Sequence, residues 1–84
     1  MSKQEKIDTL FEVESHTNKI LTDGKSVEVE LYNKRNCCRF IFHGNKDIIL
    51  HEKLTLSDAI QLINSFYQGV LASRAYGINK GDLK

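Results

Sequence analysis

The 84-residue sequence contains no proline, no tryptophan and only two cysteines. No run of apolar residues approaches the roughly 20 that a membrane-spanning helix needs, and residues 1–11, MSKQEKIDTLF, lack the apolar core of a signal peptide. We therefore expect a cytoplasmic protein. Because neighbouring side chains of a strand point to opposite faces, the adjacent Cys37 and Cys38 are expected to remain reduced thiols rather than form a disulfide.

The formal net charge is only +1, so the whole chain has no strong attraction to nucleic acid, and such binding would require a local basic patch. Hydrophobic residues make up 40% of the chain and charged residues 27%, which is typical of a globular protein rather than a disordered one. A chain of this length forms one domain with one small core. We therefore expect residues 1–84 to be a single domain with loose ends at 1–8 and 78–84.

Residues 55–77 predict the most clearly marked element, an amphipathic helix. Thr55 suits the N-cap, with Asp58 three residues later, and Gly77 suits the left-handed residue that follows a helix. Between them, apolar residues recur every three or four positions, as expected for a stripe on one helix face. This stripe consists of Leu56, Ala59, Ile60, Ile63, Phe66, Tyr67, Val70 and Leu71. Such a helix needs a sheet to cover.

Residues 26–32 and 37–43 alternate apolar and polar side chains, as half-buried strands do. The four-residue loop between them would close a hairpin in which every inward pair is apolar and Glu30 lies opposite Arg39 on the outer face. A three-residue turn then leads to a further strand at residues 47–54. The register expected for this second hairpin pairs Phe42 with Ile48, Ile41 with Ile49, Phe40 with Leu50, Arg39 with His51 and Cys37 with Lys53.

Residues 11–21 fit a strand or, with gaps, a helix. We favour the strand because Phe11, Val13 and Ser15 alternate, and an Asp-Gly turn at residues 23–24 would join it to the next strand. The predicted fold is therefore α+β: a three- to four-stranded antiparallel meander with one long C-terminal amphipathic helix packed on one face (ββββα). The helix would cover the face that includes Ile48 and Leu50, and residues 2–10 could form a short N-terminal helix.

The sequence contains none of the usual nucleotide-binding, nucleophile-elbow or paired-cysteine motifs. Cys37, His43 and His51 could share the outer face of the sheet, which is the minimum for a thiol nucleophile or a metal site. A zinc site normally needs three or four ligands, and the nearby carboxylates are not spaced to complete one. Packing cysteines and surface histidines explain the pattern better, so we expect no enzymatic activity, no metal and no cofactor.

The outer face of the predicted sheet would form a mixed basic and aromatic patch with an apolar centre. Lysine and arginine neutralise phosphates, and an aromatic ring or guanidinium plane can stack on unpaired bases. The candidate binding residues for nucleic acid or a partner protein are Tyr32, Lys34, Arg35, Arg39, His51 and Lys53. An ordinary solvated face is the competing interpretation.

Three further residues are candidates for an oligomer interface: Ile41 and Ile49 on the outer face, and Gly69 in the helix. Glycine costs a helix about 1 kcal/mol relative to alanine, so close approach of a second helix would explain Gly69, although simple tolerance would also explain it. We expect a homodimer, or a partner interface, at these positions.

These observations favour a small non-enzymatic binding or regulatory protein that acts by contact with a host protein or RNA. Frequent lysine, asparagine and isoleucine indicate an AT-rich bacterial or phage genome, and the expected type is a phage or mobile-element accessory inhibitor. The expected partners are a second copy, a host protein and single-stranded RNA, with no membrane and no small-molecule cofactor. The alternatives are a single-stranded nucleic-acid-binding protein that uses the outer-face patch, and a small enzyme that depends on Cys37.

Overall fold

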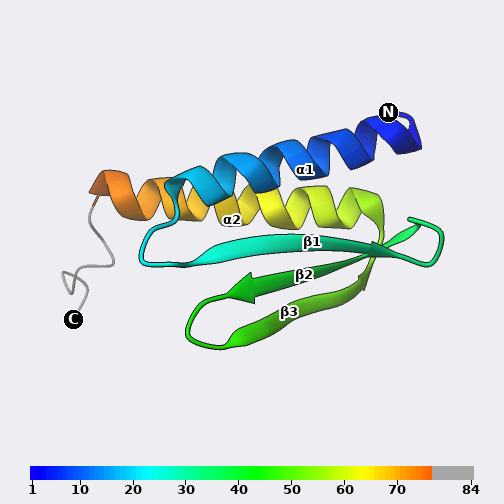
Figure 1. Cartoon of the computed structure of the whole chain (residues 1–84). Helices are drawn as coiled ribbons and strands as arrows, with labels where there is room; N and C mark the ends of the chain where they lie inside the picture. The colour runs from blue at the N-terminus through cyan, green and yellow to red at the C-terminus, as the bar shows by residue number, and fades with distance from the viewer. Residues whose placement is uncertain (77–84) are drawn as a thin grey trace.

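The computed structural model describes residues 1–76, which form two helices and a three-stranded sheet in the order αβββα (Figure 1). The elements are α1 (Lys3–Ile20), β1 (Ser26–Tyr32), β2 (Cys37–His43), β3 (Asp47–Leu54) and α2 (Leu56–Tyr76). The fold is α+β with an antiparallel sheet, as predicted. The expected helix-ending Gly77 and the tail at 78–84 lie outside the described residues.

The prediction of a strand at residues 11–21 is wrong, because nearly all of this stretch belongs to α1. The helix begins with a capping box in which the Ser2 hydroxyl accepts from the Glu5 N–H and the Glu5 carboxylate accepts from the Ser2 N–H. The same helix corrects the expected order of four strands. It includes the short N-terminal helix that residues 2–10 could form, and it is longer than the sequence indicated. The buried positions Ile7, Leu10 and Thr17 keep a helical spacing. The polar Thr17 hides that spacing in the sequence, and its hydroxyl donates to the Val13 carbonyl at 2.7 Å.

The sheet has the strand order β1-β2-β3. The predicted register of the first hairpin is confirmed, including Glu30 opposite Arg39. Agreement between the alternating pattern and the loop length explains this success, since a shift by one residue would turn every side chain to the wrong face.

The second hairpin follows the predicted register only near its turn, where Phe42 pairs with Ile48 and Ile41 with Ile49. Two irregularities in β3 then shift the pairing. As a result, Phe40 lies opposite His51 rather than Leu50, and Cys38 lies opposite Leu54, so the expected pairs Arg39–His51 and Cys37–Lys53 are wrong. Lys53 has a left-handed backbone (φ 57°) at the second irregularity.

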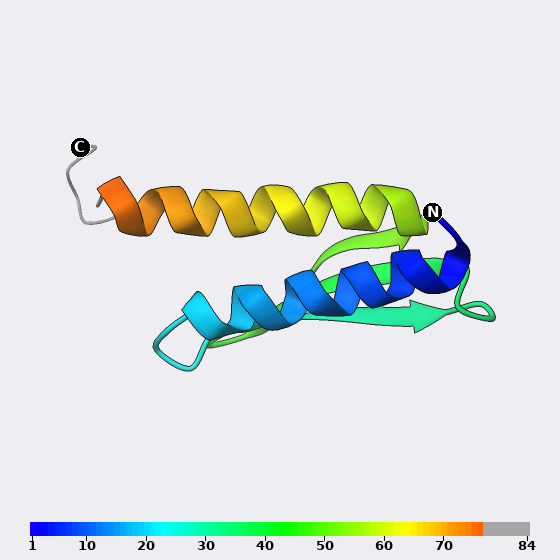
Figure 2. The same ribbon diagram turned by 90° about the horizontal axis from the view of Figure 1, so that it is seen from above.

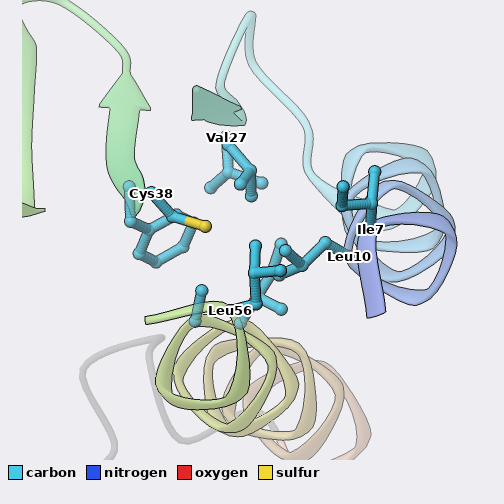
Figure 3. Packing of buried hydrophobic residues seen from close by; sticks show 9 residues of the cluster. Ile7, Leu10, Val27, Cys38 and Leu56 are labelled. Atoms are coloured by element: carbon cyan, nitrogen blue, oxygen red, sulfur yellow. The ribbon is translucent and has the colours of Figure 1, made fainter. Parts of the chain in front are cut away.

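Both helices lie on one face of the sheet, side by side (Figures 1 and 2). The predicted start of α2 is confirmed, because the Thr55 hydroxyl accepts from the Asp58 N–H at 3.1 Å. Figure 3 shows how side chains from both helices and from the strands meet in one core, in which the Cys38 sulfur is enclosed. The buried core consists of Ile7, Leu10, Val27, Val29, Cys38, Phe40, Leu56, Ala59 and Ile63.

The helical layer does not cover β3, and every residue of this strand except Leu54 is exposed. The expectation that Ile48 and Leu50 lie beneath the helix is therefore wrong: they are 51% and 39% exposed. Their neighbour Ile49 is 52% exposed on the other face. These three residues form an exposed apolar set, called the β3 patch below.

Candidate functional site

The outer face of the sheet, which neither helix covers, holds a tight cluster around Arg39. The guanidinium donates to the Glu30 carboxylate, and its Nε lies 3.3 Å from Oε1 of Glu52. It also lies over the Tyr32 ring, 5.2 Å from the ring centroid. Two carboxylates therefore offset the charge of Arg39: Glu30, which the predicted hairpin register already placed opposite it, and Glu52, which the sequence did not indicate.

Tyr32 ties the three strands together across this face. Its hydroxyl accepts from the Lys53 backbone N–H at 2.8 Å, so a β1 side chain stabilises the irregular end of β3. One face of its ring is occupied by Arg39. The structure thus brings Tyr32, Arg39 and Lys53 together, but it uses the tyrosine and the arginine in contacts within the sheet. His51 lies elsewhere, facing the α2 side of β3 beside Leu62.

A second charged cluster surrounds His43 at the opposite end of the outer face. Its Nε2 lies 2.8 Å from Oε1 of Glu28, and its Nδ1 lies 2.8 Å from Oδ1 of Asp47. The hydrogen bond to Asp47, followed by that to Glu28, raises the pKa of His43. When His43 is protonated, it can form ion pairs with both carboxylates and so links β1, β2 and the start of β3.

The start of α1, the β1–β2 loop and the end of β3 lie at the same end of the molecule (Figure 1), and each of these segments carries basic residues. We call Lys3, Lys34, Arg35 and Lys53 the basic end; all four are exposed. The Lys3 ammonium donates to the Lys34 carbonyl at 2.9 Å. The sequence interpretation missed Lys3, because it treated the first residues as loose, although Ser2 and Glu5 mark a helix start.

The backbone of the basic end is strained. Lys34, Arg35 and Lys53 have left-handed φ values of 56°, 66° and 57°, and Asn33 has 52°. For residues other than glycine this conformation costs about 1–2 kcal/mol each, although asparagine tolerates it better. Three of the four left-handed residues at this end are lysine or arginine. Glycine would adopt the same backbone conformation at these positions with a lower conformational energy.

A groove with a volume of about 630 Å³ lies on the other side of the molecule, between the α1–β1 connection and the second half of α2. Phe42 and Phe66 line it, with ring centroids 6.3 Å apart. Gly69 also lines it, and a Cβ added there would meet nothing within 4 Å. We call this the α2 groove; its lining residues are Ile20, Leu21, Thr22, Asp23, Lys25, Phe42, Phe66, Gly69, Val70, Ser73 and Arg74.

The two edges of the sheet differ in what covers them. Along β1, the Asn18 carboxamide donates to the Val27 carbonyl (3.0 Å) and accepts from the Val27 N–H (2.7 Å), as a neighbouring strand would. Glu14 accepts from the Val29 N–H at 2.6 Å. Burial, together with the nearby Glu28, raises the pKa of Glu14 against the opposing effect of this hydrogen bond. Within residues 1–76, no strand pairs with the outer edge of β3.

The structure also locates the other predicted interface residues and the cysteines. Ile41 is half-buried and pairs with the exposed Ile49. Of these two candidate interface residues, Ile49 on β3 therefore offers more apolar surface to a partner. Cys37 and Cys38 are both free thiols, and burial raises the pKa of Cys38. In the part of the chain that the structure describes, no three His, Cys, Asp or Glu side chains are grouped to hold a metal ion.

The same residues contain no helix that is long and apolar enough to cross a bilayer. Comparison of the chain with protein-family models, with curated proteins and with solved structures finds no match, so the surfaces described above are interpreted from their own geometry.

Proposed function

We propose that this chain is a small non-enzymatic binding protein that works as a homodimer and acts by contact with a host protein or RNA. The observation that supports the proposal is the β3 patch, in which three consecutive large apolar residues, Ile48 to Leu50, are exposed on both faces of one strand. Contiguous exposed apolar surface of this kind marks interaction sites in folded proteins.

A second copy of the chain is the occupant that fits this surface. The β3 patch continues into the α2 groove through Phe42, which pairs with Ile48 and lines the groove. α2 also runs past the end of the sheet (Figures 1 and 2), so its Val70 and Leu71 are only partly covered. Each copy therefore has a projecting helix and an open groove. In one twofold interface, the helix of each copy can fill the groove of the other.

The charge of the surface agrees with this occupant. Asp23, Lys25 and Arg74 line the groove and carry both signs of charge, so two copies related by a twofold axis can place opposite charges together.

Pairing of two β3 edges is a less suitable geometry. The irregularities at Leu50 and Lys53 interrupt the strand, so two β3 edges cannot form a regular ladder of hydrogen bonds. The proposed contact therefore places the second half of α2 in the groove of the partner, near Gly69.

Sedimentation velocity of three variants tests the dimer. Leu50→Lys should shift the protein to monomer over a concentration range of about 1 µM to 1 mM, which spans weak dimers. Phe11→Lys is the matched control, because Phe11 is also 39% exposed but lies on α1; it should leave association unchanged.

Gly69→Leu provides a second, independent disruption. A Cβ at this position meets nothing within 4 Å, so a leucine side chain should be tolerated in its own chain and should occupy the groove and exclude the partner helix. A wild-type monomer at the highest concentration would contradict the proposal, and so would equal effects of the substitutions at Leu50 and Phe11.

A further inference from the structure

The basic end combines side chains from three separate segments into one unit. The Lys3 ammonium donates to the Lys34 carbonyl at 2.9 Å. The Lys53 N–H donates to the hydroxyl of Tyr32 at 2.8 Å, and Tyr32 directly precedes the β1–β2 loop. The ion pairs of the described chain engage Arg39 and His43 and none of the four residues of the basic end. Their charges are therefore directed at solvent.

The strained backbone indicates that these charges serve a purpose. A loop that only joined β1 to β2 would be more stable with glycine at the left-handed positions Lys34 and Arg35, and the same holds for Lys53. Residues held in such conformations cluster at functional sites. The nearest acidic side chain of α1, Glu5, is engaged with the Ser2 N–H.

We propose that the basic end binds the phosphodiester backbone of a single-stranded nucleic acid. A single strand carries one negative charge per nucleotide, and four cations from three segments can contact several phosphates of one strand. The cluster contains no apolar anchor of the kind that dominates protein interfaces. Recognition is independent of base sequence, because the contacts are with phosphates rather than base edges, and Arg39 already covers one face of the Tyr32 ring.

Fluorescence anisotropy with a labelled oligothymidylate of about 20 nucleotides, longer than the usual single-strand site, measures this binding. Contacts with four phosphates predict a slope of about −3 for log affinity against log salt, which is roughly a 50-fold loss between 50 and 200 mM salt. Lys34→Gln/Arg35→Gln should reduce this slope by about 1.4.

Lys19→Gln/Lys46→Gln is the matched control, because it removes the same charge from exposed residues in the last turn of α1 and in the β2–β3 turn, at the opposite end of the molecule and outside the α2 groove. This control should keep the wild-type affinity within about twofold. A third variant, Lys34→Gly/Arg35→Gly, separates the charge from the backbone strain. It should weaken binding and at the same time raise the urea midpoint of unfolding, because glycine relieves the left-handed positions.

Several results would overturn the assignment. These are undetectable binding at about 50 mM salt, equal losses in the two glutamine double variants, or equal affinity for polyglutamate of the same charge, which would indicate an acidic protein partner. The site does not depend on the proposed dimer: the monomeric Leu50→Lys variant should retain the affinity per basic end, so that failure of one proposal leaves the other measurable.

Discussion

Replacement of Asn18 by alanine should destabilise the protein far more than loss of a half-buried helical side chain usually does. The Asn18 carboxamide makes two hydrogen bonds with the backbone of Val27, one to its N–H and one to its carbonyl. Val27 is only 2% exposed, so water cannot readily replace either bond. Alanine leaves both groups without a partner at the edge of β1.

The magnitude follows from the number of backbone groups left unpaired. Each buried group that loses its partner costs about 1–3 kcal/mol, so the loss of both partners should cost about 2–6 kcal/mol. A chain of this length has a total stability of about 4–13 kcal/mol. Helix propensity acts in the opposite direction, because alanine favours a helix over asparagine by up to about 0.7 kcal/mol. The measured loss of stability will therefore slightly underestimate the contribution of the two hydrogen bonds to Val27.

Urea unfolding followed by circular dichroism measures this loss. With a slope of about 1.5 kcal/mol per molar urea, a loss of 3 kcal/mol lowers the midpoint by about 2 M. Asn64→Ala is the matched control, since Asn64 is exposed on α2 and its replacement should leave the midpoint unchanged or slightly higher. Hydrogen exchange gives a local readout: the Val27 amide should lose protection selectively in Asn18→Ala.

The reasoning is refuted if Asn18→Ala and Asn64→Ala have the same midpoint and the Val27 amide stays protected. Such a result would mean that water reaches the edge of β1, and the carboxamide would then contribute little. Loss of stability together with aggregation would support the contacts, because an uncovered edge offers its backbone groups to other chains.

Three further predictions concern charge and backbone. Glu14→Gln should stabilise the protein at neutral pH. The folded-state pKa of Glu14 is raised, so the stability of the wild type falls as pH rises from 4.5 through that pKa. Glutamine carries no charge and can still accept the hydrogen bond from the Val29 N–H. Urea unfolding at acidic and neutral pH should show the advantage shrinking on acidification, and an advantage independent of pH would contradict it. Gly69→Ala should raise the stability by about 0.5–1 kcal/mol, since its Cβ has free space; a lower thermal midpoint would show that the groove is tighter than described. The pKa of His43 is raised by Asp47 and Glu28, so its contacts should stabilise the fold fully below pH 6.5 and lose this effect as pH rises through the folded-state pKa. His43→Gln should remove that part of the pH dependence of stability. An unchanged dependence of stability on pH would contradict this role of His43.

The elements that the sequence predicts correctly are those that local pattern determines. α2 has an N-cap at Thr55 and an unbroken apolar stripe, and the β1–β2 hairpin has matching strand patterns with a loop of suitable length. α1 could not be recognised in this way, because the inward positions Glu14 and Thr17 are polar. Their partners, the Val29 N–H and the Val13 carbonyl, are backbone groups that no residue pattern displays.

The surfaces depend on the arrangement of whole elements, and this explains why they were predicted only in part. The exposure of Ile48 and Leu50 follows from a helical layer that stops short of β3, and the apolar run in the sequence is equally consistent with burial. Likewise, the predicted register paired Arg39 with Glu30 alone, but in the structure Glu52 also offsets its charge. Glu52 reaches Arg39 because the irregular pairing of β3 changes which residues share the outer face.

The side-chain cover on β1 determines the direction in which the sheet can grow during folding. Asn18 and Glu14 reach β1 across only 9 and 15 residues of chain, so the entropy cost of closing these loops is small. We expect α1 and β1 to associate before the more distant β3 has a place to dock. With one side of β1 closed, β2 can add only on the other, and β3 follows it. The N-terminal helix thus provides the surface on which β1 docks first, and the other strands then pair in chain order.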